Sequence, residues 1–113
     1  MLNASDILRG YTDTIILAQL VGGDSYGYVI SKNVHEMTHG EMQLKEATLY
    51  TTFRRLESAG VIESYWGNEN AGARRRYYHL TDAGRRLYEE NIEDWRKYRA
   101  MISALFGMEE NAR

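Results

Sequence analysis

The sequence of 113 residues contains no cysteine and no proline. Without cysteine, the chain cannot form disulfides, thiolate metal sites or a cysteine nucleophile. Without proline, glycines and capping residues have to set the ends of helices and strands. No stretch comes near the roughly 18 consecutive apolar residues of a membrane-spanning helix, and the N-terminus lacks the pattern of a signal peptide. We therefore expect a cytoplasmic protein with no membrane partner.

The net charge of the chain is slightly negative, but its arginines are concentrated in two places. Fourteen Lys and Arg residues against sixteen Asp and Glu give a formal charge of −2. This sum argues weakly against a nucleic-acid partner, because phosphates require local positive potential. The arginines, however, gather at Arg54–Arg55 and Arg74–Arg76. A fold that brought these groups onto one face would give that face the charge needed to bind DNA.

Two helices are predicted before residue 40, within a chain whose length and 43% hydrophobic content fit one compact unit. Apolar residues at helical spacing predict the first over residues 6–21, with Ser5 as N-cap and Gly22 as stop. The second is expected to start from a cap at Asp24 or Ser25, to run to about Met37, and to be terminated by Gly40. Its inward-facing side chains are expected to be Tyr26, Val29, Ile30, Val34 and Met37.

A third helix is predicted over residues 46–59, and Gly60 stands where a C-terminal glycine belongs. Leu49, Phe53 and Leu56 follow the i, i+4, i+7 spacing of a buried face. The residues on its other faces, largely towards solvent, are then Thr48, Thr51, Thr52, Arg54 and Arg55.

The second half of the chain predicts a β-hairpin and one long helix. Residues 61–66 and 74–80 are rich in strand-forming side chains, and 67–73 have the composition of a loop, expected to be a mobile tip. Thr81 is the expected N-cap of a helix over residues 82–106. The apolar positions of this helix are Leu87, Ile92, Trp95, Tyr98, Ile102 and Leu105.

The predicted order of helix, helix, helix, hairpin and long helix is typical of a winged helix-turn-helix fold, mainly α with a small β-hairpin. Residues 1–80 would form the DNA-binding domain and 81–113 a dimerisation helix, together one compact unit. A helix fits the major groove of DNA, and the basic strand can lie along the neighbouring phosphates. The last helix carries more apolar surface than one small core can use, which favours a homodimer.

Several motifs resemble the PadR family of transcriptional regulators, over about residues 7–106. Their ordered combination is more specific than any one of them. They are Leu8-Arg9-Gly10-Tyr11, Tyr26-Gly27-Tyr28, Ala47-Thr48-Leu49-Tyr50, Arg54-Arg55-Leu56-Glu57, Gly60-Val61-Ile62, and Arg74 through Gly84. The chain is most similar to the short subgroup with a single C-terminal helix, and to a multidrug-binding regulator within it. The resemblance implies a dimeric repressor of two-fold operator DNA that is released by a ligand, without cofactor or enzymatic activity.

The resemblance also implies two sets of site residues. The residues expected at DNA are Lys32, Lys45, Thr48, Tyr50, Thr51, Arg54, Arg74, Arg75 and Arg76. In the multidrug-binding relative a tryptophan of the last helix pairs with its symmetry mate across a dimer pore and sandwiches flat aromatic ligands, and Trp95 stands at the corresponding place. The residues implied to line the pore for a small aromatic or amphipathic ligand are Ile7, Thr14, Asn91, Ile92, Trp95, Arg99 and Ile102.

Two residues depart from the pattern of these relatives. Arg99 stands where the multidrug-binding regulator has an acidic residue that favours cationic drugs, so neutral or anionic ligands are expected instead. Lys45 stands where the family usually has serine or asparagine at the N-cap of the third helix. A lysine cannot accept backbone N–H bonds, which predicts a looser helix start or a contact from Lys45 to a phosphate.

Two other functions remain open from the residues alone. The segment His35-Glu36-Met37-Thr38-His39 matches the H-E-x-x-H pattern of zinc hydrolases, in which two histidines share one helix face. Gly40 would end that helix immediately, and no third ligand is evident, so two partly exposed histidines are the favoured interpretation and no metal is expected. The net negative charge also leaves open a winged-helix module that binds another protein.

Overall fold

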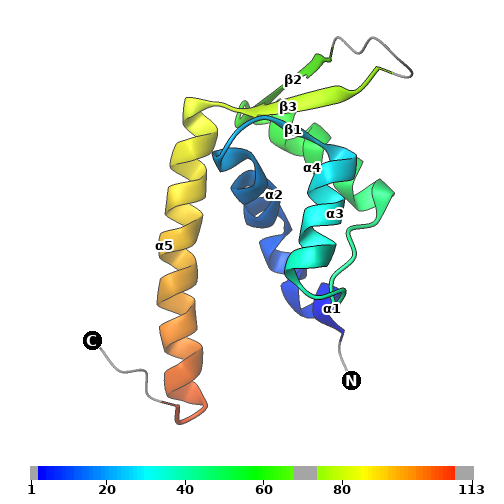
Figure 1. Cartoon of the computed structure of the whole chain (residues 1–113). Coiled ribbons are helices and arrows are strands. Elements are labelled where there is room, and N and C mark those ends of the chain that lie inside the picture. Colours follow the sequence, from blue (N-terminus) through cyan, green and yellow to red (C-terminus); the bar gives the residue numbers. More distant parts are fainter. Residues whose placement is uncertain (1–2, 68–73, 109–113) are drawn as a thin grey trace.

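The computed structural model describes residues 3–67 and 74–108 (Figure 1). The helical elements are α1 (Ala4–Leu8), the 3-10 turn η1 (Arg9–Tyr11), α2 (Thr12–Val21), α3 (Gly27–Met37), α4 (Glu46–Ser58) and α5 (Asp82–Leu105). The strands are β1 (Ser25–Tyr26), β2 (Ile62–Trp66) and β3 (Arg76–Leu80). The chain is thus mainly helical with a small antiparallel sheet, which confirms the predicted fold class.

The first predicted helix, over residues 6–21, is in fact two helices joined by a 3-10 turn. The turn contains Gly10, whose lack of a side chain lowers its helix propensity. Ser5 was predicted as the N-cap of this helix, and this prediction was wrong. Instead Asn3 Oδ1 accepts the backbone N–H of Asp6 at 2.9 Å. The predicted stop was right, since Gly22 follows α2 as its C-cap.

The second predicted helix begins later than expected because its first residues form a strand. Ser25 pairs with Tyr78 and Tyr26 with Tyr77, so β1 is the edge strand beside β3. Neither Asp24 nor Ser25 caps α3, whose N-cap position is the extended Tyr26. The helix ends at Met37 as predicted, but the Met37 side chain is 70% exposed and does not face inward.

The wing is the hairpin of β2 and β3, with register from Ile62 opposite Leu80 to Trp66 opposite Arg76. Residues 68–73, where a mobile tip was predicted, lie outside the described residues. Thr81 caps α5 as predicted, because its Oγ1 accepts the backbone N–H of Gly84 at 3.0 Å. Among the described residues, no helix is both long and apolar enough to span a lipid bilayer.

The core lies between the helices and the inner face of the sheet. Phe53 of α4 stacks on Tyr78 of β3, with ring centroids 3.8 Å apart and planes 16° from parallel. This stack fixes α4 beside the wing. The N-terminal part of α5 packs against α2, whereas its C-terminal part stands apart from the other described helices and strands (Figure 1). The buried apolar side chains are Ile16, Leu17, Leu20, Ile30, Val34, Met42, Leu44, Leu49, Phe53, Leu56, Val61, Ile62, Tyr78 and Leu80.

Candidate nucleic-acid interface

Helix α4 presents a polar face to solvent because its apolar residues lie on the opposite side. Leu49, Phe53 and Leu56 are buried, as their spacing predicted. Thr52 was expected largely towards solvent but is only 3% exposed. Burial of its hydroxyl is compensated by a bond to the carbonyl of Thr48 at 2.8 Å. The outward residues are Ala47, Thr48, Tyr50, Thr51, Arg54, Arg55 and Ser58.

The start of α4 lacks a side-chain cap from its N-cap residue. Lys45 occupies the N-cap position with extended backbone, and its side chain makes no capping hydrogen bond. The side chain is exposed. The first N–H groups of α4 therefore lack a side-chain acceptor from the N-cap residue, and such groups favour an anion.

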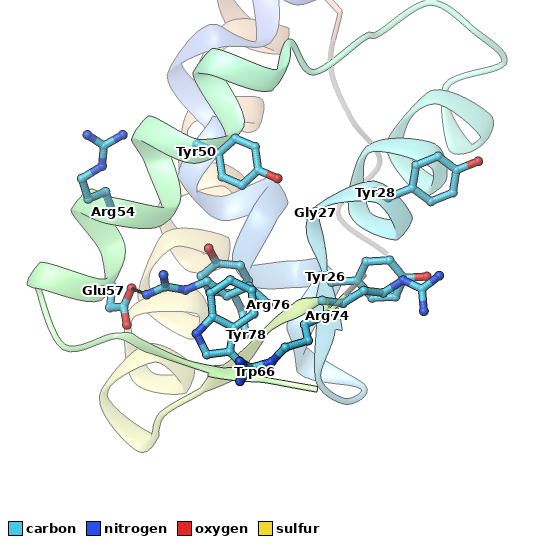
Figure 2. A pocket seen from close by; sticks show the side chains of 11 residues that line it. Tyr26, Gly27, Tyr28, Tyr50, Arg54, Glu57, Trp66, Arg74, Arg76 and Tyr78 are labelled. Atoms are coloured by element: carbon cyan, nitrogen blue, oxygen red, sulfur yellow. Dashed lines mark hydrogen bonds and ion pairs between the residues drawn. The ribbon is translucent and has the colours of Figure 1, made fainter. Parts of the chain in front are cut away.

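A groove of about 680 Å³ separates α4 from the wing (Figure 2). Tyr50 and Arg54 line it from α4, and Trp66 lines it from β2. The arginine group of residues 74–76 lines it from the start of β3 and the two residues before that strand. The fold thus brings Arg54 together with the arginines of residues 74–76, whereas Arg55 does not line the groove.

The wing arginines lie against aromatic rings. The guanidinium carbons of Arg74 and Arg76 lie 5.2 and 5.7 Å from the centroid of the Trp66 ring. That of Arg75 lies 5.1 Å from the centroid of Tyr26. Such contacts hold a cation in place while leaving its charge available. Trp66 therefore orients two arginines of the wing.

Arg76 is tied to α4 through a network that the sequence did not reveal. Arg76 Nη2 lies 3.5 Å from Glu57 Oε1 (Figure 2). Arg76 Nη2 also donates to Ser64 Oγ at 2.7 Å, and Ser64 Oγ donates to Glu57 Oε2 at 2.5 Å. Glu57 comes from the last turn of α4. The network joins that end of α4 to both strands of the wing, so Arg76 is a structural link as well as a cation.

The neighbouring arginines Arg54 and Arg55 have different surroundings. Arg55 forms two hydrogen bonds of 2.7 Å to Asp13, which hold the pKa of Arg55 above its usual value. Within residues 3–67 and 74–108, Arg54 makes no hydrogen bond or ion pair, and its side chain is exposed. Arg54 is therefore the arginine of α4 that is available to a ligand.

A second polar cluster joins the turn before β1 to the outer face of the wing. Asp24 Oδ2 accepts the hydroxyl of Tyr65 at 2.6 Å, and Asp24 Oδ1 lies 2.8 Å from His79 Nδ1. The Tyr65 hydrogen bond, followed by that of His79, lowers the pKa of Asp24 from its ordinary 3.8. The same bond raises the pKa of Tyr65.

This cluster predicts an acid-sensitive wing. A carboxyl group with a lowered pKa in the folded chain stabilises the fold at pH values above 3.8, and this contribution is lost as pH falls through the lowered pKa. The Asp24→Asn variant is therefore expected to lose less thermal stability than the wild type on acidification through that window. Circular dichroism melts measure this, with Glu63→Gln of the neighbouring strand as control. Equal acid sensitivity of Asp24→Asn and wild type would contradict the assignment.

An apolar pocket of about 410 Å³ lies between α2, α3 and α5. Of the residues predicted to bind a ligand, Thr14, Ile92 and Trp95 line it. Asn91 lies beside it, because its Nδ2 donates to Thr14 Oγ1 at 3.0 Å. The apolar pocket is also lined by Leu8, Tyr11, Ile15, Ala18, Gln19, Val34, Met37, Thr38 and Met42, which sequence reasoning did not single out as ligand contacts.

The three other predicted ligand residues lie outside the lining of this pocket. Arg99 holds its guanidinium carbon 5.3 Å from the centroid of the Trp95 ring. Ile7 and Ile102 are 61% and 48% exposed. Within one chain, the apolar pocket therefore brings together only some of the residues that were predicted to bind a ligand.

Comparison with known proteins identifies the family. The model of the family described as "Transcriptional regulator PadR-like family" matches residues 16–90. This chain belongs to the PadR-like family of transcriptional regulators. A structure of a transcriptional regulator from Clostridium thermocellum is similar over 88% of this chain and 97% of its own, with 47% identity and a TM-score of 0.81. An uncharacterized protein of Lysinibacillus sphaericus is 42% identical over 87% of this chain and 90% of its own.

The PadR-like fold also occurs in a structure that contains DNA. Bacillus subtilis PadR, solved in complex with operator DNA, has a TM-score of 0.65 to this chain over 72% of it and 46% of the Bacillus chain. At 22% identity, this similarity shows the shared fold alone. The family resemblance inferred from the sequence motifs is confirmed by the match of residues 16–90.

The zinc-hydrolase alternative has no support in this PadR-like chain. Helix α3 ends at Met37, and His39 has a φ of 52°, so His35 and His39 do not share one helix face. Across residues 3–67 and 74–108, no three His, Cys, Asp or Glu residues are grouped as a metal site would need. The family and the similar structures are transcriptional regulators and not enzymes.

Proposed function

We propose that this regulator binds two-fold operator DNA as a homodimer, represses transcription there, and responds to a small ligand. The observation that carries DNA binding is the groove between the polar face of α4 and the arginines of the wing. A helix enters the major groove, and the wing then meets the adjacent sugar–phosphate backbone. The local charge outweighs the net charge of −2, because phosphates interact mainly within a Debye length.

Helix α4 is the recognition helix of this proposal. Thr48, Tyr50, Thr51 and Arg54 are exposed on it and would contact bases and phosphates. Lys32, on the solvent side of α3, and Lys45, at the start of α4, would bind the DNA backbone. The guanidinium groups of Arg74, Arg75 and Arg76 would bind phosphates beside the wing.

The homodimer is supported by the uncovered face of α5. Trp95 and Ile102 are 37% and 48% exposed, and no other helix or strand of the described residues covers the C-terminal part of α5 (Figure 1). An apolar face of this kind is stabilised by burial against a second copy. The further exposed apolar residues of this region are Tyr98, Met101, Leu105 and Phe106. Residues 1–80 would then form the DNA-binding domain, and residues 81–113 the dimerisation segment.

The removal of Arg54 tests DNA binding most simply. Arg54→Ala is expected to weaken binding to operator DNA about tenfold at physiological salt and to lower the salt slope by about two, because each subunit of the proposed homodimer loses one cation that displaces counterions. Fluorescence anisotropy at several salt concentrations measures both quantities. Lys97→Ala, which removes an exposed cation from the face of α5 opposite Trp95, is the control. Unchanged affinity of Arg54→Ala would contradict the proposed role.

The ligand site is proposed at the dimer interface beside Trp95. Its apolar pocket, with Arg99 over the indole ring, suits a small aromatic or amphipathic molecule that is neutral or anionic. Ile7, Thr14, Asn91, Ile92 and Ile102 would complete the site in the dimer. A ligand that changes the spacing of the recognition helices lowers DNA affinity, and DNA lowers ligand affinity by the same factor.

The two tryptophans of the chain provide a direct test of this site. The anionic dye anilinonaphthalene sulfonate is expected to quench the emission of Trp95 in a Trp66→Phe variant. The same dye should leave the emission of Trp66 unchanged in a Trp95→Phe variant, because Trp66 lies on the wing. Quenching of both residues alike, or of Trp66 only, would contradict the location of the site.

A further inference from the structure

A two-pronged ion pair joins the recognition helix to α2. Arg55 Nη1 donates to Asp13 Oδ2, and Arg55 Nη2 donates to Asp13 Oδ1, both at 2.7 Å. Asp13 lies in the first turn of α2, and Arg55 lies in the last turn of α4. Because both groups are planar and the two bonds are parallel, the pair fixes orientation as well as distance.

The stability of the chain gives little reason for such a pair. The side chains of Arg55 and Asp13 are 57% and 36% exposed. Exposed ion pairs add little to the free energy of unfolding, because water screens the attraction and two side chains lose rotational freedom. The main effect of the ion pair is therefore to fix the direction of α4 relative to α2.

The residue that follows Asp13 connects α2 to the other side of the molecule. Thr14 Oγ1 accepts the side-chain amide of Asn91, on α5, at 3.0 Å. Consecutive residues of α2 thus bind the recognition helix and the long helix, and α2 and α5 pack side by side (Figure 1). Buried apolar side chains of α2 and α4 also belong to one core cluster, and apolar packing lacks the directionality of hydrogen bonds.

We propose that Asp13 and Arg55 are positioning residues that fix the direction of the recognition helix relative to α2 and, through Thr14 and Asn91, relative to α5. In the dimer this pair sets how the two recognition helices meet successive major grooves. Arg55 acts through Asp13 and not as a phosphate contact, in contrast to Arg54. The effect on DNA rests on the proposed function, whereas the effect on helix direction does not.

The direction of α4 can be measured without DNA because the chain has no cysteine of its own. Spin labels at Ser58→Cys on α4 and Lys97→Cys on α5 report the distance between these helices. Dilution with excess unlabelled chain restricts the measurement to labels within one chain. Asp13→Asn and Arg55→Lys are expected to broaden or shift the distance distribution, and the exchanged pair Asp13→Arg with Arg55→Asp is expected to restore it. An unchanged distribution in Asp13→Asn would overturn the proposal.

DNA binding supplies the second readout on the same variants. Asp13→Asn is expected to lower selective affinity for operator DNA about tenfold with little change in melting temperature, and the exchanged pair to recover most of it. If Arg55 contacted phosphates instead, the exchanged pair would bind as weakly as Arg55→Asp alone, which would overturn the proposal. If the wild type shows no selective DNA binding, the proposed function fails, and the distance measurement still decides the role of the pair.

Discussion

A chain with Ile102 replaced by glutamate is expected to be monomeric and to bind operator DNA about a hundredfold or more weakly, because the two half-sites then bind independently. Ile102 lies on the uncovered apolar face of α5 and is 48% exposed in the single chain. The substitution leaves the fold of one chain intact, but it places a carboxylate in a dimer interface without a partner. Sedimentation measures the mass, and anisotropy measures the affinity.

Ala104→Glu is the matched control for this prediction. It introduces the same charge on α5, two residues away, on the face opposite Trp95 by helical spacing. This variant should remain dimeric and keep its DNA affinity. Dimeric Ile102→Glu with unchanged affinity would show that the dimer is built elsewhere.

Replacing Gly84 with alanine is expected to destabilise the fold by about 3 kcal/mol or more, because the added methyl group has no space. A Cβ at Gly84 would overlap the carbonyl oxygen of Val61 and lie 2.7 Å from Leu80 Cδ1. That carbonyl cannot move freely, since it accepts the backbone N–H of Thr81 at 3.2 Å. The close approach of α5 to the start of the wing therefore requires glycine.

Thermal unfolding tests this prediction, with an expected fall in melting temperature of about 12 °C or more. Gly10→Ala is the control, because a Cβ at Gly10 would meet nothing within 4 Å. It should melt at or slightly above the wild-type temperature, as alanine restricts the unfolded chain. A Gly84→Ala variant that melts with the control would contradict the packing described here.

The regular parts of the fold could be predicted from local patterns. The spacing of Leu49, Phe53 and Leu56 predicted the buried face of α4, and the strand-forming side chains of residues 74–80 predicted a strand. Both signals extend over several consecutive residues, so the rest of the chain is less able to override them. The cap at Thr81 was equally local, since its hydroxyl binds a backbone group three residues away.

The errors arose where distant residues decide the local structure. Ser25 and Tyr26 form a strand because β3, some 50 residues later in the chain, offers them backbone partners. No periodicity exists in two residues. The break at Gly10 had a visible signal in the glycine itself, but apolar spacing on both sides of it suggested one continuous helix.

In the candidate site, too, contacts between distant residues could not be predicted from the sequence. Arg54 and Arg55 are adjacent and identical in type, yet within residues 3–67 and 74–108 only Arg55 has an acid partner, 42 residues away. The tie between Glu57 and Arg76 likewise depends on how the wing meets α4. Sequence composition located the basic groups correctly, whereas the division between structural and available arginines required the fold.

The most direct test of the central claim is fluorescence anisotropy with the DNA upstream of this protein's own gene, against a scrambled duplex, at two salt concentrations. The account predicts tight binding that is selective for the upstream DNA and falls steeply as salt rises. Equal, weak binding to both duplexes, repeated with other promoters, would contradict it and would indicate that the fold serves a protein partner.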